Sequence, residues 1–440
     1  MKIAEIEINN YRQFEYIKFD FTYPFGHKRE GEPLDKVCFI GQSGTGKTTL
    51  LNIISKYISS LQEIAHDDIL HHATDDLLDH IRVSCLIKEN PFIFDGTSSL
   101  VIDKHGNYSF EEIIDAINSI DKLCLFIKDS VALEADLFLF GNYTEKASNN
   151  LIRTNTQVIK DRYERENQLN SLSQKRIIEL GEGIIPSIWN YFLQDIYAYD
   201  EKGREFAKKI ISNPNNFSAN KLLSDLASWK AKTPNPRKEI ADLYLNRILD
   251  KFHLKIDVED SEAPLVLKTT SGVKIDNSYL STGTRQLLST AIPLFAINTH
   301  NTVIIIDEPE RSLFPDIQRE LIKYYTSLAP DSQFFFATHS PIIAASFEPE
   351  ERFILYFDEN GNVQCRNGVA PIGDDPNDVL RQDFGMSPLM QDAGLKAYQR
   401  YVDLATAIKN EPDIDRKMNL LGERAELGNR YNFPALNETN

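Results

Sequence analysis

The chain has 440 residues, 42% hydrophobic and 26% charged, a composition typical of a globular protein with room for more than one domain. Its formal net charge of -17 argues against a general nucleic-acid coat, because nonspecific DNA affinity comes from neutralised phosphates, but it allows local DNA or RNA contact. The four cysteines lie far apart and no apolar run approaches the roughly 20 residues of a membrane span, so we expect a cytoplasmic chain without membrane contact.

The chain opens with two predicted strands, residues 2–12 and 14–23, in which apolar and polar residues alternate. This alternating pattern, with its acids, is unlike a signal or transit peptide. Residues 37–61 then combine a short apolar run, a glycine-rich turn and apolar residues at helical spacing. The pattern indicates a strand, a phosphate-binding loop and a helix, and residues 1–65 are therefore the first half of a predicted nucleotide-binding domain.

The turn matches the phosphate-loop pattern G-x-x-x-x-G-K-[ST] in full. Glycines let successive backbone N–H groups point at phosphate oxygens, and the helix that follows adds its positive end. Lys47 is predicted to bridge the β- and γ-phosphates during catalysis, and the Thr48 hydroxyl to bind Mg²⁺. A chance glycine-rich turn is the alternative, against which the flanking strand and helix argue. The predicted nucleotide-binding residues are Gly41, Gln42, Ser43, Gly44, Thr45, Gly46, Lys47, Thr48 and Thr49.

Residues 66–265 are predicted to hold further strands of this domain and an inserted, mostly helical region. Within it, residues 145–250 are polar with helical spacing. A hairpin is predicted at residues 265–275, where Ser271 and Gly272 set the turn. The strand patterns of the region lie at residues 81–89, 98–104, 122–127 and 135–143.

Alternating helices and strands return over residues 266–345, the predicted second half of the domain. Continuous apolar strands that alternate with helices indicate a parallel sheet covered on both faces, so the predicted class is α/β with antiparallel N-terminal strands. Residues 346–440 are assigned to a strand hairpin and a helical tail. Helices are expected at residues 281–297 and 316–329, and buried strands at residues 302–307 and 333–340.

Two acids stand at the end of the strand at residues 302–307. Asp307 is predicted to hold Mg²⁺ and Glu308 to polarise the attacking water, although apolar strands ending in aspartate are common. Upstream, Ser281 and the Gly283 backbone precede a helix and are placed to grip a γ-phosphate, while an ordinary serine helix cap is the simpler interpretation of these residues alone. His339 ends the next buried strand, a position that is more often structural than catalytic.

In this order, the phosphate loop, LSTGTRQ, DEPE and ATHSP resemble the ABC ATPase superfamily. The variants LSTGTRQ, DEPERSLFP and ATHSP are similar to its RecF/SMC/OLD branch rather than to transporter subunits, and the opening IEINNYRQF resembles that branch's first strand. The specific motifs cover residues 1–60 and 270–345, and the similarity between them is one of general organisation. The resemblance implies an ABC-type nucleotide-binding domain with ATP and Mg²⁺ as ligands.

The resemblance also implies a role for each matching residue. Asp307 supports the metal, Glu308 is the general base, His339 senses the γ-phosphate and Arg12 contacts the nucleotide. The signature loop touches ATP held by another copy, so a competent site needs a homodimer, and hydrolysis is expected to be slow. Residues 310–315 correspond to the loop that couples the two sites. The signature residues are Ser281, Thr282, Gly283 and Gln286.

The sequence departs from the RecF/SMC/OLD branch in several features, and these departures limit the functions that the resemblance implies. A Q-loop glutamine is not evident, residues 140–143 being the best position for its strand, and the insertion is too short for SMC coiled-coil arms. The Asp413-Ile414-Asp415 sequence resembles a nuclease motif but lacks a preceding apolar strand, which favours an exposed turn, and no His-Asn-His cluster is present. A set of ATPase motifs without an evident nuclease motif resembles the stand-alone ATPases of bacterial anti-phage systems, such as the PtuA-like ATPases of Septu and retrons. These pair with a separately encoded effector, often a nuclease.

Two weaker groups of residues leave alternatives open. A histidine- and aspartate-rich segment has the chemistry of a transition-metal site, but its spacing matches no defined one and a polar helix face explains it. A tryptophan with basic residues favours single-stranded nucleic acid or a protein partner, while interleaved acids favour a solvated helix. The first group is His66, Asp67, Asp68, His71, His72, Asp75, Asp76, Asp79 and His80, and the second is Arg153, Lys160, Arg162, Arg165, Trp229, Lys230, Lys232, Arg237 and Lys238.

These observations favour a defence ATPase that acts as a nucleotide-gated clamp or scaffold for an effector such as a nuclease. A RecF/SMC-like DNA repair or recombination ATPase is the alternative. A transporter subunit is a third hypothesis, against which the ERSLFP and THSP variants and the large insertion argue.

Overall fold

The computed structural model describes residues 1–66, 77–87, 90–95, 100–103, 110–132, 174–181, 186–212, 219–261, 263–276, 279–386 and 389–433. They form two compact units, Met1–Asp374 and Asp375–Asn440. The predicted boundary after residue 345 lies inside the first unit, because the hairpin that follows it joins the central sheet.

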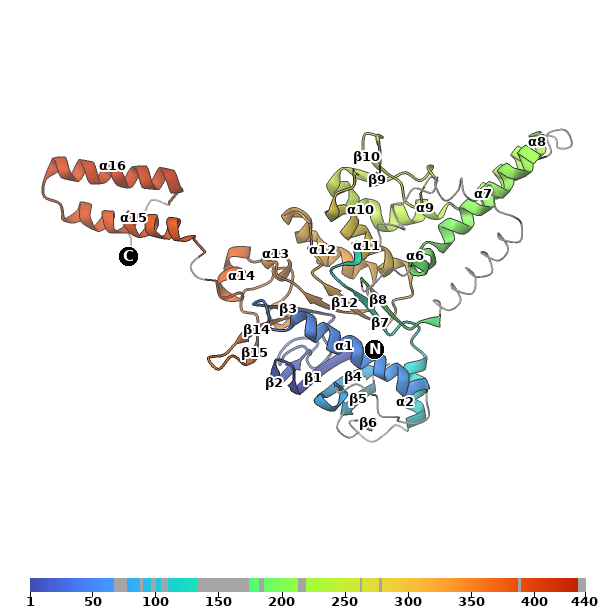
Figure 1. The fold of residues 1–440 in the computed structure, drawn as a ribbon, viewed down its shortest axis with the longest axis horizontal. Helices are drawn as coiled ribbons and strands as arrows, with labels where there is room; N and C mark the ends of the chain where they lie inside the picture. The colour runs from blue at the N-terminus through green and yellow to red at the C-terminus, as the bar shows by residue number, and fades with distance from the viewer. Residues whose placement is uncertain are drawn as a thin grey trace. The chain divides into compact units, whose positions relative to one another are not determined.

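A seven-stranded sheet forms the centre of the first unit, in the order β15-β14-β3-β13-β12-β7-β8 (Figure 1). Neighbouring strands are parallel from β14 to β8, and β15 runs antiparallel to β14. Every residue of β12 and β13 is buried, which accounts for their uninterrupted apolar sequences. The strands are β3 (Lys36–Gly41), β7 (Cys124–Ile127), β8 (Ile177–Leu180), β12 (Val303–Asp307), β13 (Gln333–Ala337), β14 (Arg352–Phe357) and β15 (Val363–Asn367).

Helices pack against the central sheet and against one another. Helix α1 (Lys47–His66) packs on β3, β7, β12 and β13, and α11 (Thr282–Ala296) packs against α12 (Pro315–Leu328). The short helix α13 (Pro341–Ala344) follows β13, and a 3-10 turn, η5 (Pro349–Glu351), precedes β14. The predicted α/β class with a mostly parallel central sheet is confirmed.

A second, five-stranded antiparallel sheet has the order β2-β1-β4-β5-β6. Its residues Ile3 and Phe19 share one hydrophobic core with Phe39 and Phe335 of the central sheet. Gln333 joins the two sheets, because its Oε1 accepts from the Ile3 N–H at 2.6 Å while its Nε2 donates to the Ile3 carbonyl at 2.8 Å. The predicted antiparallel strands at the N-terminus are thus confirmed. The strands are β1 (Lys2–Tyr11), β2 (Phe14–Asp20), β4 (Ile81–Ile87), β5 (Asn90–Asp95) and β6 (Leu100–Asp103), with the 3-10 turn η1 (Leu78–His80) before β4.

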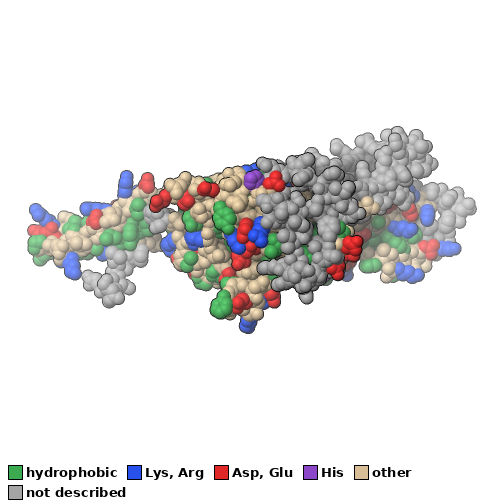
Figure 2. All heavy atoms as spheres, turned by 90° about the horizontal axis from the view of Figure 1, so that it is seen from below, with side chains coloured by type: hydrophobic (Ala, Val, Ile, Leu, Met, Phe, Trp, Pro, Cys, Tyr) green, Lys and Arg blue, Asp and Glu red, His purple; other side chains and the backbone are tan. Residues whose placement is uncertain are grey.

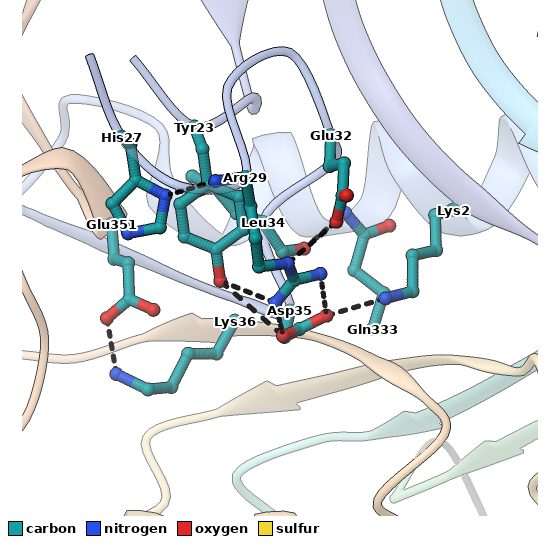
Figure 3. A network of polar contacts seen from close by, with 10 residues as sticks. All are labelled: Lys2, Tyr23, His27, Arg29, Glu32, Leu34, Asp35, Lys36, Gln333 and Glu351. Atoms are coloured by element: carbon teal, nitrogen blue, oxygen red, sulfur yellow. Dashed lines mark hydrogen bonds and ion pairs between the residues drawn. The ribbon is translucent and has the colours of Figure 1, made fainter. Parts of the chain in front are cut away.

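A polar network ties the loop before β3 to the amino end of that strand (Figure 3). The Asp35 carboxylate accepts from the Lys2 ammonium at 2.5 Å and from the Arg29 guanidinium. Lys36, the first residue of β3, pairs with Glu351. The network therefore connects β1, the loop, β3 and the turn before β14.

The middle of the first unit is helical where it is described, and it ends in a small antiparallel sheet, β11-β10-β9. The predicted hairpin at residues 265–275 is confirmed, because Leu267 of β10 pairs with Ile275 of β11. The strand predicted at residues 135–143 lies outside the described residues. The elements are α2 (Phe110–Asn118), α6 (Pro186–Phe192), α7 (Gln194–Ser212), α8 (Ala219–Lys232), α9 (Pro236–Glu239), the π-helix η2 (Ile240–Leu245), α10 (Asn246–Leu249), η3 (Asp250–Phe252), β9 (Leu254–Ile256), β10 (Leu267–Thr269) and β11 (Lys274–Ile275).

The second unit consists of the short helix α14 (Pro376–Gln382) and a hairpin of α15 (Asp392–Asn410) and α16 (Ile414–Tyr431). Arg400 pairs with Glu423 at 2.8 Å across the hairpin, and Figure 2 shows hydrophobic, basic and acidic side chains interspersed along it. Asp413, predicted in an exposed turn, caps α16 by accepting from the Arg416 N–H at 2.9 Å. Within the described parts of both units, no helix has the length and apolar character that a membrane span requires.

Candidate nucleotide-binding site

The phosphate loop leaves the carboxyl end of β3, and α1 begins at Lys47. Gly46 has a φ of 95°, a left-handed conformation that favours glycine. A Cβ at Gly46 would lie 2.0 Å from Gln13 Nε2, the end of a flexible side chain in the turn between β1 and β2, and 2.8 Å from Cζ of the buried Phe14. Glycine is therefore favoured here for two reasons, the backbone conformation and the close approach of the Phe14 ring.

The turn that covers the loop contains Arg12 and Gln13. Arg12 is exposed with a φ of 52°, and its guanidinium carbon lies 5.5 Å from the centre of the Tyr11 ring. Gln13 Nε2 donates to Thr49 Oγ1 at 3.4 Å. The sequence carries no local signal for Gln13, because its position depends on how the β1–β2 turn folds over α1.

Lys47 is 6% exposed and folds back over its own loop. Its ammonium donates to the carbonyls of Gly41 at 3.0 Å and Gln42 at 3.2 Å, and it forms no ion pair with any described residue. Burial lowers the pKa of Lys47, while the charges of Asp307 and Glu308 act in the opposite direction. A buried cation held only by carbonyl oxygens is suited to exchange them for phosphate oxygens.

Thr48 and Asp307 meet across the ends of α1 and β12. The Thr48 hydroxyl donates to Asp307 Oδ2 at 2.8 Å. Burial raises the pKa of Asp307 to about 6, opposed by the hydrogen bond from Thr48 and strengthened by the charge of Glu308. A hydroxyl and a buried carboxylate are oxygen ligands of the kind that Mg²⁺ prefers, and the cation would relieve the cost of the buried charge. The chemistry of these two residues fits a magnesium site.

Glu308 and His339 face each other at the ends of β12 and β13, with Glu308 Oε1 4.0 Å from His339 Nε2. Both side chains are partly exposed, at 40% and 47%. Glu308 has a φ of 47°, a strained conformation for a residue with a side chain, and its N–H donates to the Ala337 carbonyl at 2.9 Å. Burial and Lys47 lower the pKa of His339, and Glu308 opposes them. The arrangement leaves a carboxylate and an imidazole open to a ligand.

Glu310, the third acid of the DEPE sequence, is half-buried and contacts the turn that carries His339. Its carboxylate accepts from Thr338 Oγ1 at 2.6 Å and from the His339 N–H at 3.1 Å. Burial raises the pKa of Glu310, although these hydrogen bonds lower it. Glu310 therefore anchors the turn that carries His339, a role that its place in the predicted coupling loop did not reveal.

On the side away from β13, β12 pairs with β7, which ends at Ile127, two residues before Asp129. Asp129 pairs with Arg311, and its charge adds to the raised pKa of Asp307. The predicted Q-loop position at residues 140–143 lies outside the described residues. Among the described residues, an acidic side chain therefore follows the β7 strand next to β12.

The signature residues begin helix α11. Ser281 is its N-cap, because its hydroxyl accepts from the Thr284 N–H at 3.1 Å, and both Ser281 and Thr282 are exposed. A Cβ at Gly283 would lie 2.4 Å from the Ser312 carbonyl, so the signature packs closely on the loop at residues 310–315. Gln286 is 2% exposed, and its Nε2 has no partner among the described residues. Within one copy, Ser281 is the helix cap that its sequence alone predicted.

The AAA ATPase domain family matches residues 1–344. The chain belongs to this family. A curated relative, the pleiotropic ABC efflux transporter of multiple drugs YBT1 of Candida glabrata, is 26% identical over 123 residues, 27% of this chain and 7% of the transporter. The chain spans less than a tenth of that relative's length. Among solved structures, the SmcHead bound to the C-winged helix domain of ScpA is similar with a TM-score of 0.40 and 11% identity, over 85% of this chain and 98% of that one.

The structure of this AAA ATPase changes the interpretation of the basic group. Arg237 is 1% exposed, and its guanidinium makes two hydrogen bonds to Asp200 at 2.7 and 2.6 Å. Trp229 packs against Tyr199 with ring centres 4.8 Å apart. Arg237 thus forms a structural ion pair with Asp200 and is not available to nucleic acid. Lys238, the next residue, is exposed. The upstream residues Arg153, Lys160, Arg162 and Arg165 lie outside the described residues.

The histidine-rich group lies mostly outside the described residues, which include His66, Asp79 and His80 of it. His80 Nδ1 lies 2.8 Å from the Asn9 carbonyl. No cluster of three or more histidine, cysteine or acidic side chains suited to a metal occurs in the described ranges.

Proposed function

We propose that this AAA ATPase binds ATP with Mg²⁺ and hydrolyses it slowly, and that the bound ATP holds two copies together as a clamp. The observation that carries the proposal is the convergence of Lys47, Thr48, Asp307, Glu308 and His339 at the carboxyl ends of β3, β12 and β13. Ligands bind at this edge in parallel α/β sheets because several loops meet there.

Each residue of the cluster has a chemical task that follows from its position. Lys47 would exchange its loop carbonyls for β- and γ-phosphate oxygens, and Thr48 and Asp307 would hold the Mg²⁺. The metal, when bound, neutralises charge on the phosphates. Glu308 accepts the proton of the attacking water, and the imidazole of His339 hydrogen-bonds the γ-phosphate. Glu310 positions His339 through its backbone N–H.

A dimer follows from the signature. The chain contains one phosphate loop and one LSTGTRQ sequence. Ser281 and Thr282 are exposed at the N-terminus of α11, which attracts an anion such as the γ-phosphate of ATP held by a second copy. ATP then binds the closed dimer more tightly than the open one, and hydrolysis reopens it.

We infer a role in anti-phage defence, with a separately encoded effector nuclease as partner. The Asp413-Ile414-Asp415 sequence is the start of a helix, which leaves the candidate nuclease motif without a strand. Helix α16 exposes Ile414, Met418 and Leu421, an apolar stripe suited to a protein partner. All four cysteines are free thiols, in agreement with a cytoplasmic setting.

Sedimentation of the full chain tests the clamp. With ATP and Mg²⁺, the Glu308→Gln protein should sediment as a dimer, while Lys47→Ala should stay monomeric under the same conditions. A Glu308→Gln protein that stays monomeric at saturating ATP would contradict the clamp.

Capture of the ATP-bound Glu308→Gln protein from its native host tests the biological role. A stoichiometric nuclease or other toxin in the captured material supports the defence function. DNA without a protein partner supports a repair or recombination ATPase instead.

A further inference from the structure

The two strands that flank the phosphate-loop strand end differently. On one side β13 leads into His339, and on the other β14 ends in Tyr356 and Phe357. Leu355 of β14 lies opposite Gly41, the first residue of the loop, so the residues after Leu355 run alongside the loop. Phe357 is 40% exposed there.

Phe357 lies directly beside the loop. A Cβ built on Gly44 would be 3.9 Å from the Phe357 Cζ, an ordinary van der Waals contact. Gly44 itself has no side chain and a φ of 87°, so no side chain of this residue lies between the ring and the loop backbone. The backbone of Phe357 is held by the β14–β15 hairpin, in which Phe357 pairs with the buried Val363. An exposed aromatic residue whose backbone is fixed by its strand loses only side-chain freedom when a ligand stacks on it.

The catalytic residues indicate which way a nucleotide lies on the loop. Asp307 is the last residue of β12, and Glu308 and His339 follow the ends of β12 and β13, so the γ-phosphate and Mg²⁺ lie on that side of β3. The nucleoside then extends to the other side of β3, where β14 ends. This step rests on the proposed function, because it takes the γ-phosphate to lie beside Glu308.

We propose that the Phe357 ring is the platform on which the purine base of the bound nucleotide stacks. Stacking of a base on an aromatic side chain contributes roughly 10- to 100-fold in affinity. Because every purine has a stacking face, the platform accepts adenine and guanine alike, and selection between them depends on other groups. The proposal assigns β14, outside the matched motifs, to nucleotide recognition.

Equilibrium binding of ATP and of inorganic tripolyphosphate to the full chain, both with Mg²⁺, separates the base from the phosphates. Phe357→Ala should weaken ATP binding roughly 10-fold and leave tripolyphosphate binding unchanged. Phe357→Trp should restore ATP binding. Tyr356→Ala is the matched control, because Tyr356 is 38% exposed, adjoins Phe357 and points to the opposite face of the strand.

Three outcomes would overturn the proposal. One is unchanged ATP affinity in Phe357→Ala, and another is an equal loss for tripolyphosphate, which would indicate a damaged loop. The third is loss of ATP affinity in Tyr11→Ala with Phe357→Ala unaffected, which would place the base at the β1–β2 turn. If the wild-type chain binds neither ligand, the proposed function fails as well, and this result is distinct from the other three.

Discussion

The two ends of the central sheet use charged residues in opposite ways. At the amino end, Asp35 accepts from Lys2 and Arg29, and Lys36 pairs with Glu351 (Figure 3). At the carboxyl end, Lys47 is bound to carbonyls of its own loop and Asp307 to a hydroxyl. These charges at the amino end are paired within the chain, whereas Lys47 and Asp307 at the carboxyl end form no ion pair with a described residue.

The pKa values of Asp35 and Asp307 differ because their surroundings differ in this way. Burial alone would raise the pKa of Asp35, but the hydrogen bonds from Arg29 and Lys2 lower it to about 2. Burial raises the pKa of Asp307 to about 6, because Thr48 and Lys47 offset only part of the cost. One aspartate therefore stabilises the folded chain as a carboxylate, and the other destabilises it until a cation binds. Uncompensated charge at the carboxyl end is what the fold contributes to ligand binding.

The largest expected effect is on catalysis at the carboxyl end. Glu308→Gln removes the proposed base and should lower the turnover of ATP roughly 100- to 10,000-fold while leaving ATP binding intact. Phosphate release under steady-state conditions and equilibrium ATP binding measure the two properties. Glu320→Gln, an exposed position on α12, is the control and should hydrolyse ATP normally. Undiminished turnover in Glu308→Gln would remove Glu308 from the mechanism.

The next effect is on binding. Lys47→Ala deletes the buried cation and should weaken ATP binding roughly 10- to 100-fold, as expected for the loss of hydrogen bonds to a charged group. Fluorescence titration with a labelled nucleotide measures it. Lys56→Ala serves as the control, since Lys56 is an exposed lysine of the same helix. Equal affinities for both variants would show that the loop binds phosphate without Lys47.

Asp307→Asn tests whether the buried carboxylate of Asp307 destabilises the folded chain. The folded pKa of Asp307 lies above the unfolded value of 3.8, so the carboxylate lowers the free energy of unfolding above pH 6 and this penalty disappears as the pH falls toward 4. Without nucleotide and Mg²⁺, Asp307→Asn should raise the free energy of unfolding at pH 7 by about 1 to 2 kcal/mol. The gain should shrink at pH 4. Urea denaturation at both pH values measures it, and destabilisation at pH 7 would refute the interpretation.

The same variant should lose the stabilisation that Mg²⁺ and ATP are expected to confer on the wild type, because the proposed metal ligand is removed. Thermal unfolding with and without both ligands compares the two proteins. A full ligand-dependent shift in Asp307→Asn would exclude Asp307 from the metal site.

The smallest effect is expected at the amino end and has the opposite sign. The folded pKa of Asp35 lies below the unfolded value of 3.8, so its stabilisation is present above pH 4 and is lost as the pH falls toward 2. Asp35→Asn should therefore lower the free energy of unfolding at pH 7 by about 1 kcal/mol, a modest value because the side chain is 45% exposed. ATP binding should be unchanged. An increase in the free energy of unfolding, as expected for Asp307→Asn, would contradict the interpretation that Asp35 stabilises the folded chain.

Much of the fold was predictable because its signals are local. The phosphate loop combines a strand, eight consecutive residues and a helix, and the buried strand before Asp307 is a continuous apolar run. The alternation of β1 and β2 and the turn of the β10–β11 hairpin are equally short-range. Patterns of this kind need no knowledge of which strands become neighbours.

Residues whose importance depends on neighbouring strands were not predictable. Gln13 reaches the loop only because β1 and β2 fold over α1, and Glu310 holds His339 only because β12 and β13 are adjacent. Asp129 approaches Asp307 because β7 lies beside β12. Arg237 has the sequence context of an exposed basic patch, yet its guanidinium is buried against Asp200.

The sequence by itself determined the chemistry of phosphate binding, since a phosphate loop works through consecutive backbone groups and one lysine. Tertiary structure alone decided which charges are paired and which remain open. Asp35 and Asp307 are the same residue type at the two ends of buried strands, but the fold brings Lys2 of β1 and Arg29 of the preceding loop to Asp35, whereas Asp307 accepts from the Thr48 hydroxyl. The reason is physical, because the pKa of a carboxylate depends on burial and on charges brought near it by the fold.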